Sequence, residues 1–317
     1  MTSQPLANTS DSALAGALPH AGALPDAAAL PIVGSLSPSR AGDFMTCPLL
    51  FRFRTIDRLP QSPSSAATRG TVVHGVLERL FDLPAGQRTA PQAAQMLRPE
   101  WEKLLAAEPE VGSLFTDEAE LVIWLASARV LLDSYFSLED PARIEPTERE
   151  SFVEVTLPGG LRLRGIIDRL DVAPTGEVRV VDYKTGRSPR EAFEGKALFQ
   201  MKFYALVIWR TRGVIPRLLQ LMYLGDSKIL RYSPDEDDLL ALERKVLSLW
   251  EAIERATQRK EFLATPSKLC DWCDYKALCP SFGGTPPPFP EQVPGPLTEE
   301  TRHVVARQRS SGVAQQG

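Results

Sequence analysis

The sequence predicts an α/β domain built on one mixed β-sheet. The hydrophobic period changes from 3.6 residues to 2 residues near position 150, and it returns to 3.6 near position 190. A short strand pattern and a long amphipathic helix pattern then follow. This order of elements, with helices first, then three strands, then a helix, a strand and a helix, is typical of a single sheet covered by helices.

The helices and strands follow from local signals. Ser37 followed by Pro38 is typical of a helix N-cap and first helical residue, and this helix would run through Phe44. Further helices are expected from near Thr71 and over 91–106, 116–137, 190–211 and 235–262. Strands are expected from Phe152 onward and over 161–172, 178–184, 216–224 and 228–233.

Both ends of the chain are predicted to lie outside this domain. Residues 1–36 are rich in Ala and Pro, and no Lys or Arg precedes Arg40, which argues against a signal peptide. Residues 283–317 are rich in Pro. We therefore expect a disordered tail at 1–36, a folded domain at 37–282 and a second disordered tail at 283–317.

The composition excludes several classes of protein. The 317 residues are 43% hydrophobic and 24% charged, which excludes a fully disordered chain, collagen and a coiled coil. No apolar run approaches about 18 residues, so no membrane partner is expected. The net charge of −4 leaves room for a local basic groove. No G-x-x-x-x-G-K-[ST] motif occurs, so the chain carries no motor of that type.

The most informative segment is an acidic hairpin. Pro174-Thr175-Gly176 fits a tight turn, and if the residues flanking it pair, Asp168 lies opposite Asp182. Like charges placed so are destabilising, and Mg²⁺ between them would remove the conflict. Lys184 shares the face of Asp182 and could orient a water or stabilise charge on a phosphate. The alternative is a surface hairpin in which each charge has a simple ionic partner.

Three polar residues elsewhere are weaker candidates. His74 is the one histidine between the two tails, and it falls on a predicted helix. A lone helical histidine is more often an ordinary core or surface residue than a metal ligand. Gln200 and Tyr204 are spaced to share one face of a helix, which by itself indicates little.

Taken in order, these motifs resemble the RecB-like branch of the PD-(D/E)XK nuclease superfamily. The matching pieces are the helix of His74, the strand segment Gly165-Ile-Ile-Asp168, the segment Asp182-Tyr-Lys184-Thr-Gly186 and the pair Gln200 and Tyr204. The resemblance implies a restriction-endonuclease-like core. It also implies that His74, Asp168 and Asp182 bind Mg²⁺ or Mn²⁺, that Lys184 is catalytic, and that Gln200 and Tyr204 support the site or contact DNA. Ile167 stands where the superfamily's namesake proline would be, as is normal in this branch.

The four cysteines form a second motif. Cys270, Cys273 and Cys279 follow a C-x2-C-x5-C spacing, and Cys47 lies far upstream. Four thiolates could hold zinc or an iron–sulfur cluster, whereas unpaired buried cysteines or disulfides are the simpler alternatives. The pattern resembles the 4Fe–4S staple of RecB-like nucleases related to the AddB and CRISPR-associated groups. A reducing, cytoplasmic location would follow from a cluster or from zinc.

The expected activity is hydrolysis of DNA by a metal-dependent nuclease. By resemblance it would be a single-strand-preferring exonuclease of DNA repair or recombination, with DNA as its partner and a helicase or repair protein as a further one. The alternative is a catalytically silent DNA-binding or scaffold module with a structural zinc or Fe–S site. Candidate phosphate contacts are Arg52, Arg54, Arg58, Arg162, Arg164, Arg169, Arg187 and Arg190.

Overall fold

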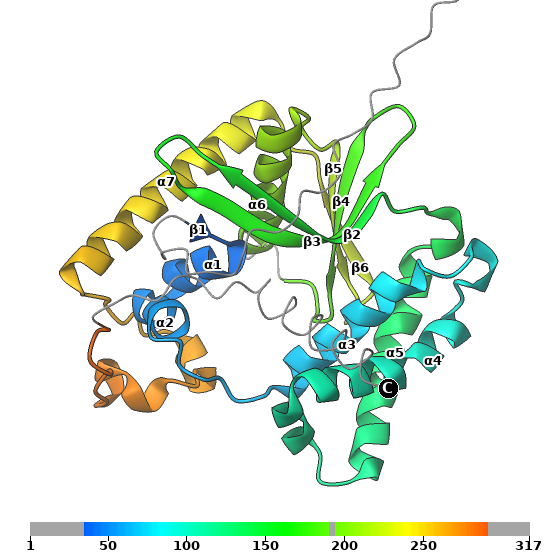
Figure 1. The fold of residues 1–317 in the computed structure, drawn as a ribbon, viewed down its shortest axis with the longest axis horizontal. Helices are drawn as coiled ribbons and strands as arrows, with labels where there is room; N and C mark the ends of the chain where they lie inside the picture. Colours follow the sequence, from blue (N-terminus) through cyan, green and yellow to red (C-terminus); the bar gives the residue numbers. More distant parts are fainter. Residues whose placement is uncertain (1–34, 190–193, 291–317) are drawn as a thin grey trace, which may run out of the picture. The chain divides into compact units, whose positions relative to one another are not determined.

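The fold is a mixed six-stranded sheet with helices on both faces (Figure 1). The computed structural model describes residues 35–189 and 194–290. The strands are β1 (Ser35–Leu36), β2 (Glu148–Thr156), β3 (Arg162–Val172), β4 (Val178–Lys184), β5 (Leu218–Tyr223) and β6 (Lys228–Tyr232). They run in the order β1-β3-β4-β5-β6, and β2 also pairs with β3. The β1–β3 and β4–β5 pairs are parallel and the others antiparallel, so the predicted mixed sheet is confirmed.

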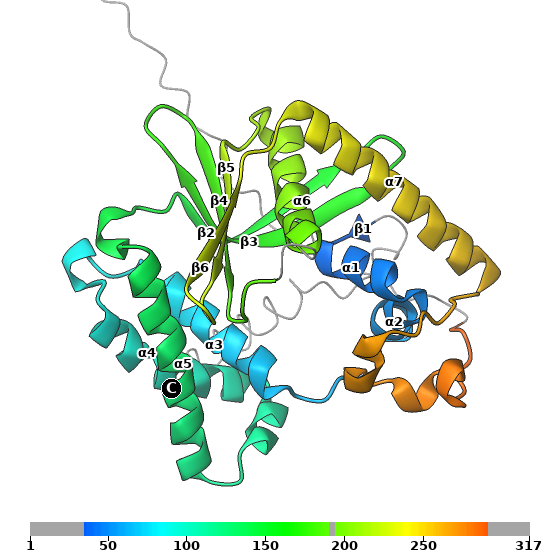
Figure 2. The same ribbon diagram turned by 180° about the vertical axis from the view of Figure 1, so that it is seen from behind.

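Two groups of helices cover the two faces of the sheet (Figure 2). One face packs against α1 (Pro38–Thr46), α2 (Pro48–Phe51), α6 (Glu194–Arg212) and α7 (Glu236–Arg259). The other packs against α3 (Ser65–Leu80), α4 (Ala90–Ala107) and α5 (Glu118–Leu138). Alternate residues of β4 explain the division, because Val180 enters the first core and Val181 and Tyr183 enter the second.

Side-chain caps set where the helices begin. Ser37 caps α1 by accepting from the backbone N–H of Arg40, with Pro38 as the first helical residue, as predicted. Ser64 caps α3 in the same way, so this helix begins six residues before the predicted Thr71. After α2 the chain continues as one turn of π-helix over Arg52–Ile56, which the sequence pattern did not indicate.

The predicted hairpin register is correct along the ladder. Ala173 donates its backbone N–H to the carbonyl of Glu177, and Gly176 takes a left-handed φ of 94° in the turn. The β3–β4 ladder then runs from Val172 opposite Val178 to Arg169 opposite Val181. It ends there, one position short of Asp168, whose carboxylate instead accepts a hydrogen bond from the backbone of β4. The two carboxylates therefore do not form a regular cross-strand pair.

Helix α5 is long and apolar enough, by length and composition alone, to cross a membrane. Its buried side chains belong to the core shared with α3 and α4, and a hydrogen bond from Trp124 to the carbonyl of Ser65 joins it to α3. Its exposed side carries charged residues such as Arg129 and Asp133, and also the apolar side chains of Val122, Ile123 and Val130, which are 50%, 71% and 62% exposed. Packing against α3 and α4 therefore covers only part of the apolar surface of this helix.

The segment after Cys279 packs against the start of the domain. Phe289 stacks on Phe262 at a centroid distance of 6.1 Å, and the guanidinium of Arg52 lies 5.2 Å from the Phe289 ring. Arg52 also donates to the carbonyl of Pro287. Packing thus continues beyond the predicted domain end at residue 282. The predicted N-terminal tail at 1–36 is also too long, because Ser35 and Leu36 form the buried strand β1. Residues 1–34 and 291–317 lie outside the described residues, so disorder there remains a prediction.

Candidate active site

His74 on α3 contacts the C-terminal end of β4. Its Nε2 lies 3.0 Å from the carbonyl oxygen of Tyr183. A carbonyl only accepts hydrogen bonds, so Nε2 carries the proton in this contact. The other nitrogen, Nδ1, then faces two carboxylates, at 3.5 Å from Oδ1 of Asp168 and 3.8 Å from Oε1 of Glu150. This orientation of an imidazole by a backbone carbonyl is typical of a metal-ligating histidine.

Asp168 is fixed at the point where β3 leaves β4. Its Oδ2 accepts from the backbone N–H of Tyr183 at 2.7 Å, and its Oδ1 faces His74. With Glu150 of β2, these residues form a group whose three ligand atoms all lie within 4.8 Å of one another. One nitrogen and carboxylate oxygens at this spacing could hold a divalent cation.

A second set of side chains surrounds Asp182. The amine of Lys184 lies 2.7 Å from Oδ2 of Asp182. Gln200 of α6 links the set, because its amide nitrogen donates to Oδ1 of Asp182 at 2.9 Å and its amide oxygen accepts from Lys184 at 2.8 Å. The same amide nitrogen lies 3.1 Å from the hydroxyl of Tyr204. Gln200 and Tyr204 therefore join Lys184 and Asp182 in one hydrogen-bonded cluster.

Close packing brings α6 to this position. A Cβ atom on Gly165 of β3 would lie only 2.7 Å from Cε1 of Tyr204. A side chain at position 165 would therefore displace the aromatic ring or the strand. Gly165, the first residue of the Gly-Ile-Ile-Asp motif, thus leaves room for the ring of Tyr204, which belongs to the Gln200 and Tyr204 motif.

The charges of the two sets influence each other. Burial raises the pKa of Asp182 to about 6, although the Lys184 ammonium opposes this shift. Burial also opposes the charged forms of His74 and Lys184, but nearby carboxylates outweigh it and raise the pKa of both. For Asp168, burial is outweighed by His74 and Lys184, which lower its pKa. Lys184 is therefore an ammonium, suited to donate hydrogen bonds and to stabilise negative charge.

The predicted site residues are thus partly assembled as expected. His74 and Asp168 lie together, and Asp182, Lys184, Gln200 and Tyr204 form one cluster beside them. Asp182 does not belong to the compact ligand group, and Glu150 does. Sequence reasoning missed Glu150, whose one signal was its place in the acidic segment that opens the first long strand.

Asp182 has its contacts within the second set. Its side chain is buried, its Oδ1 accepts from Gln200, and its Oδ2 lies 2.7 Å from the Lys184 ammonium. The donor set that fits a divalent cation is therefore the nitrogen and carboxylate oxygens of His74, Glu150 and Asp168, and a role of Asp182 as a metal ligand stays a prediction.

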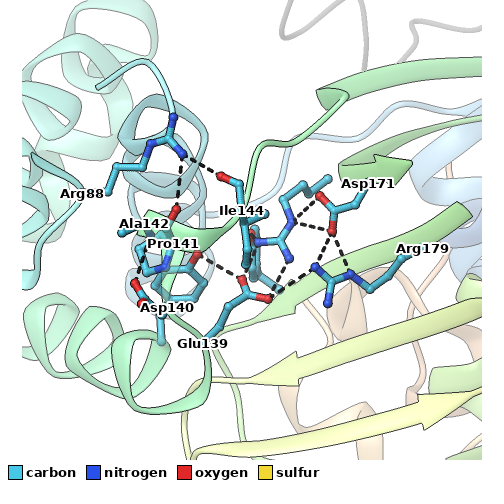
Figure 3. A network of polar contacts seen from close by, with 11 residues as sticks. Arg88, Glu139, Asp140, Pro141, Ala142, Ile144, Asp171 and Arg179 are labelled. Atoms are coloured by element: carbon cyan, nitrogen blue, oxygen red, sulfur yellow. Dashed lines mark hydrogen bonds and ion pairs between the residues drawn. The ribbon is translucent and has the colours of Figure 1, made fainter. Parts of the chain in front are cut away.

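Behind the site, a buried ionic network joins α5 to β3 and β4 (Figure 3). Glu139 lies at the end of α5, and Arg169 forms a two-pronged pair with it at 2.5 and 2.8 Å. The same guanidinium donates to the hydroxyl of Tyr183 at 2.7 Å and to Asp171, which also binds Arg179. Arg169 is only 1% exposed, so the expectation that it contacts phosphate is wrong.

The other arginines expected to contact DNA lie in different surroundings. Arg52 and Arg164 are buried, while Arg54 and Arg162 are paired with Asp43 and Glu154. Arg58 is half-buried, and Arg187 is exposed. Arg190 lies outside the described residues. Burial therefore rules out Arg52 and Arg164 as simple surface contacts, whereas Arg187 lies just beyond the active-site strand β4.

The four cysteines line one cavity together with apolar side chains. Cys47 lies between α1 and α2, Cys270 and Cys273 lie in and after a 3₁₀ turn, and Cys279 follows a second such turn. All four are free thiols of intermediate exposure. Backbone N–H groups of Thr265 and Ser267 donate to the sulfurs of Cys47 and Cys270. This set brings the start and the end of the domain to one place.

Comparison with known proteins identifies relatives of the whole domain. The family model described as the PD-(D/E)XK nuclease superfamily matches residues 35–280. The Gene 69 proteins of Mycobacterium phages D29 and L5 are 26% and 24% identical, each over 78% of this chain and 96% of the relative. A crystal structure from Eubacterium rectale, provisionally described as an exonuclease, is similar in fold with a TM-score of 0.51 and 13% identity. That likeness covers 76% of this chain and 87% of the other.

Proposed function

This chain belongs to the PD-(D/E)XK nuclease superfamily, and on that premise we propose that it is a Mg²⁺- or Mn²⁺-dependent deoxyribonuclease of the RecB-like branch. The observation that carries the proposal is the convergence of two carboxylates, one histidine and one lysine at the junction of β3, β4 and α3. A catalytically silent DNA-binding or scaffold module would have no need of this combination of carboxylates, histidine and lysine at one junction.

In this proposal the residues have separate tasks. Asp168, Asp182 and His74 hold the cation, which when bound polarises the scissile phosphate and lowers the pKa of a water molecule. Lys184 is an ammonium, so it stabilises the charge that develops on the phosphate and orients the attacking water as a donor. Gln200 holds Lys184 and Asp182 in place through both ends of its amide, and Tyr204 supports Gln200.

Water then attacks phosphorus while one phosphorus–oxygen ester bond breaks, and the released strand end takes up a proton. The RecB-like resemblance favours an exonuclease that prefers single strands and acts in DNA repair or recombination. The nuclease acts alone or together with a helicase or repair protein, and the same resemblance is the ground for proposing that partner. A cytoplasmic location belongs to the same proposal.

We also infer that the cysteines hold a 4Fe–4S cluster. All four line one cavity, and two of the sulfurs accept backbone hydrogen bonds, which stabilise thiolates. Zinc held by the same four thiolates is the alternative occupant of this cavity.

The test is an assay of anaerobically purified full-length protein on end-labelled single- and double-stranded DNA. We expect shortening of the labelled strand with Mg²⁺ or Mn²⁺ and none with EDTA. Asp168→Asn should remove the metal-dependent cleavage, while Asp271→Asn, an exposed carboxylate near the cysteines, should retain it. Cleavage that persists in EDTA or in Asp168→Asn would contradict the proposal.

A further inference from the structure

Strand β2 is irregular at one position in its register with β3. Arg149 pairs with Arg169 and Ser151 pairs with Ile167, so the ladder is regular on both sides. Glu150 lies between them, opposite Asp168, and this pair is missing from the ladder. Glu150 adopts a φ of 43°, a left-handed value that is unfavourable for a residue with a Cβ atom. The interruption therefore falls on the residue that faces a proposed metal ligand.

The unusual backbone carries the Glu150 carboxylate to His74. Its Oε1 lies 3.8 Å from Nδ1 of His74, and Oδ1 of Asp168 lies 3.5 Å from the same nitrogen. The other ring nitrogen of His74 contacts the carbonyl of Tyr183, so Nδ1 is the atom available between the two carboxylates. Two carboxylates that face one ring nitrogen favour a positive charge between them, either on the ring itself or on a bound cation.

Neighbouring contacts hold this part of β2 against α3. Arg149 donates to the carbonyl of Glu78 and pairs with Asp82 at 2.8 Å, both at the end of the α3 region. Glu78 lies one helical turn after His74. The strand residue next to Glu150 is thus fastened to the helix that carries His74, and Glu150 is not a freely moving surface side chain.

Other glutamates of β2 differ from Glu150. Glu148 binds Arg212 at 2.7 Å, and Glu154 faces Arg162 at 3.9 Å. Within the described part of the chain, Glu150 has no lysine or arginine at ion-pair distance, and His74 is its ionic partner. Its side chain is 18% exposed, so water compensates its charge only in part.

We propose that Glu150 is a direct ligand of the divalent cation, together with His74 and Asp168. This inference rests on the proposed function and adds a carboxylate that the expected set of His74, Asp168 and Asp182 did not contain. The strained backbone of Glu150 is then a functional feature, since it brings a third oxygen donor to the cation from a strand that carries none of the motif residues.

The test measures Mn²⁺ binding to the full-length protein from the loss of the free Mn²⁺ EPR signal. Glu150→Gln should weaken binding at least about tenfold, since even residues that only orient a ligand typically contribute about 10–100-fold. Glu154→Gln on the same strand is the matched control and should bind as wild type. Glu150→Gly should remain folded, because glycine accepts the left-handed backbone, yet bind Mn²⁺ as weakly as Glu150→Gln. Unchanged binding in both Glu150 variants would overturn the inference.

A double-mutant cycle separates a ligand from a residue that only orients His74. In a His74→Ala background, Glu150→Gln should still weaken Mn²⁺ binding if Glu150 touches the cation. Loss of the effect in that background would assign Glu150 a positioning role and overturn the proposal. Asp168→Asn, measured in parallel, separates the role of Glu150 from the existence of the cation site. If Asp168→Asn weakens Mn²⁺ binding and the Glu150 variants do not, only the assignment of Glu150 as a ligand fails. If no variant weakens Mn²⁺ binding, the proposed cation site fails as well.

Discussion

The amine of Lys184 lies 2.7 Å from a carboxylate oxygen of Asp182, and one amide group, that of Gln200, bonds to both. Lys184 and Asp182 lie two residues apart on one face of β4, and each contacts a different atom of the same amide. Gln200 thus holds both side chains in place from a different element, α6. The geometry therefore assigns Gln200 a positioning role that its sequence spacing to Tyr204 alone did not establish.

Lys184→Ala should reduce DNA cleavage by at least about 10²-fold, because the donor that stabilises phosphate charge is lost. The measurement is single-turnover cleavage of end-labelled DNA with saturating Mg²⁺. Lys202→Ala, on α6 but bonded to Asp238 and Tyr232 instead, is the matched control and should retain activity. Near wild-type cleavage by Lys184→Ala would be incompatible with the proposed mechanism.

Gln200→Ala should lower the single-turnover rate by roughly 10–100-fold, with DNA affinity unchanged, because Lys184 and Asp182 lose their shared partner. Gln200→Glu distinguishes positioning from simple packing. Glutamate can still accept from Lys184 but cannot donate to Asp182, so it should restore little activity. If Gln200→Ala instead weakens DNA binding with the rate unchanged, the residue contacts DNA rather than the catalytic pair.

Gly165→Ala should lower both stability and activity, since the added Cβ would lie 2.7 Å from the ring of Tyr204. Overpacking of this kind typically costs about 1–3 kcal/mol. Chemical denaturation checks the stability and DNA cleavage checks the activity. Gly42→Ala in α1 is the control, because a Cβ there has no neighbour within 4 Å and alanine favours a helix. Equal stability and activity of the two variants would mean that the close approach of Gly165 to Tyr204 has no importance.

Much of this architecture could be predicted from sequence because local chemistry sets it. The turn at Pro174-Thr175-Gly176 fixed the register of β3 and β4, and the predicted bounds of β4 agree with the structure. The start of α3 was missed because the apolar face begins near Thr71, whereas the capping residue, Ser64, lies in a polar segment without helical periodicity.

The long-range part of the site could not be predicted in the same way. Glu150 lies 76 positions after His74, and its acidic neighbours, Glu148 and Glu154, have ordinary ionic partners. Charge alone therefore could not distinguish Glu150 from the other two glutamates. The end of the β3–β4 ladder at Arg169 could not be predicted either. It depends on the hydrogen bond from the backbone N–H of Tyr183 to the side chain of Asp168 and on the packing of Arg169. Arg169 was expected to contact DNA because its buried partner, Glu139 at the end of α5, lies 30 positions away and no local pattern connects the two.

Glu139→Gln should destabilise the domain by about 3–5 kcal/mol at pH 7, because it leaves the buried charge of Arg169 without its main partner. Burial alone would raise the pKa of Glu139, but Arg169 outweighs it and lowers the pKa below the ordinary value of 4.5. The stabilisation is therefore present above pH 4.5 and is lost as the pH falls through the lower folded-state pKa. Urea unfolding as a function of pH should show wild type approaching the variant in acid.

The matched control for this pH dependence is Glu118→Gln at the other end of α5. Its partner Arg98 is exposed, so the change should be worth at most about 1 kcal/mol at any pH. A difference between wild type and Glu139→Gln that stays constant down to pH 3 would show that packing, rather than the ion pair, is responsible.

Cys279→Ser should remove the brown colour and the iron of anaerobically purified protein, because a 4Fe–4S cluster needs four thiolates. The cavity of the four cysteines joins residues near 47 to residues near 279, so losing the cluster releases a loop of over 200 residues in the unfolded chain. A cross-link of that kind is typically worth about 2–5 kcal/mol, which chemical denaturation under anaerobic conditions can measure.

Ser281→Ala, two residues on and exposed, should leave colour, iron content and stability unchanged. A colourless wild-type protein that contains one zinc ion per chain would replace the cluster with a zinc site, and an unaltered spectrum in Cys279→Ser would remove this cysteine from the ligand set.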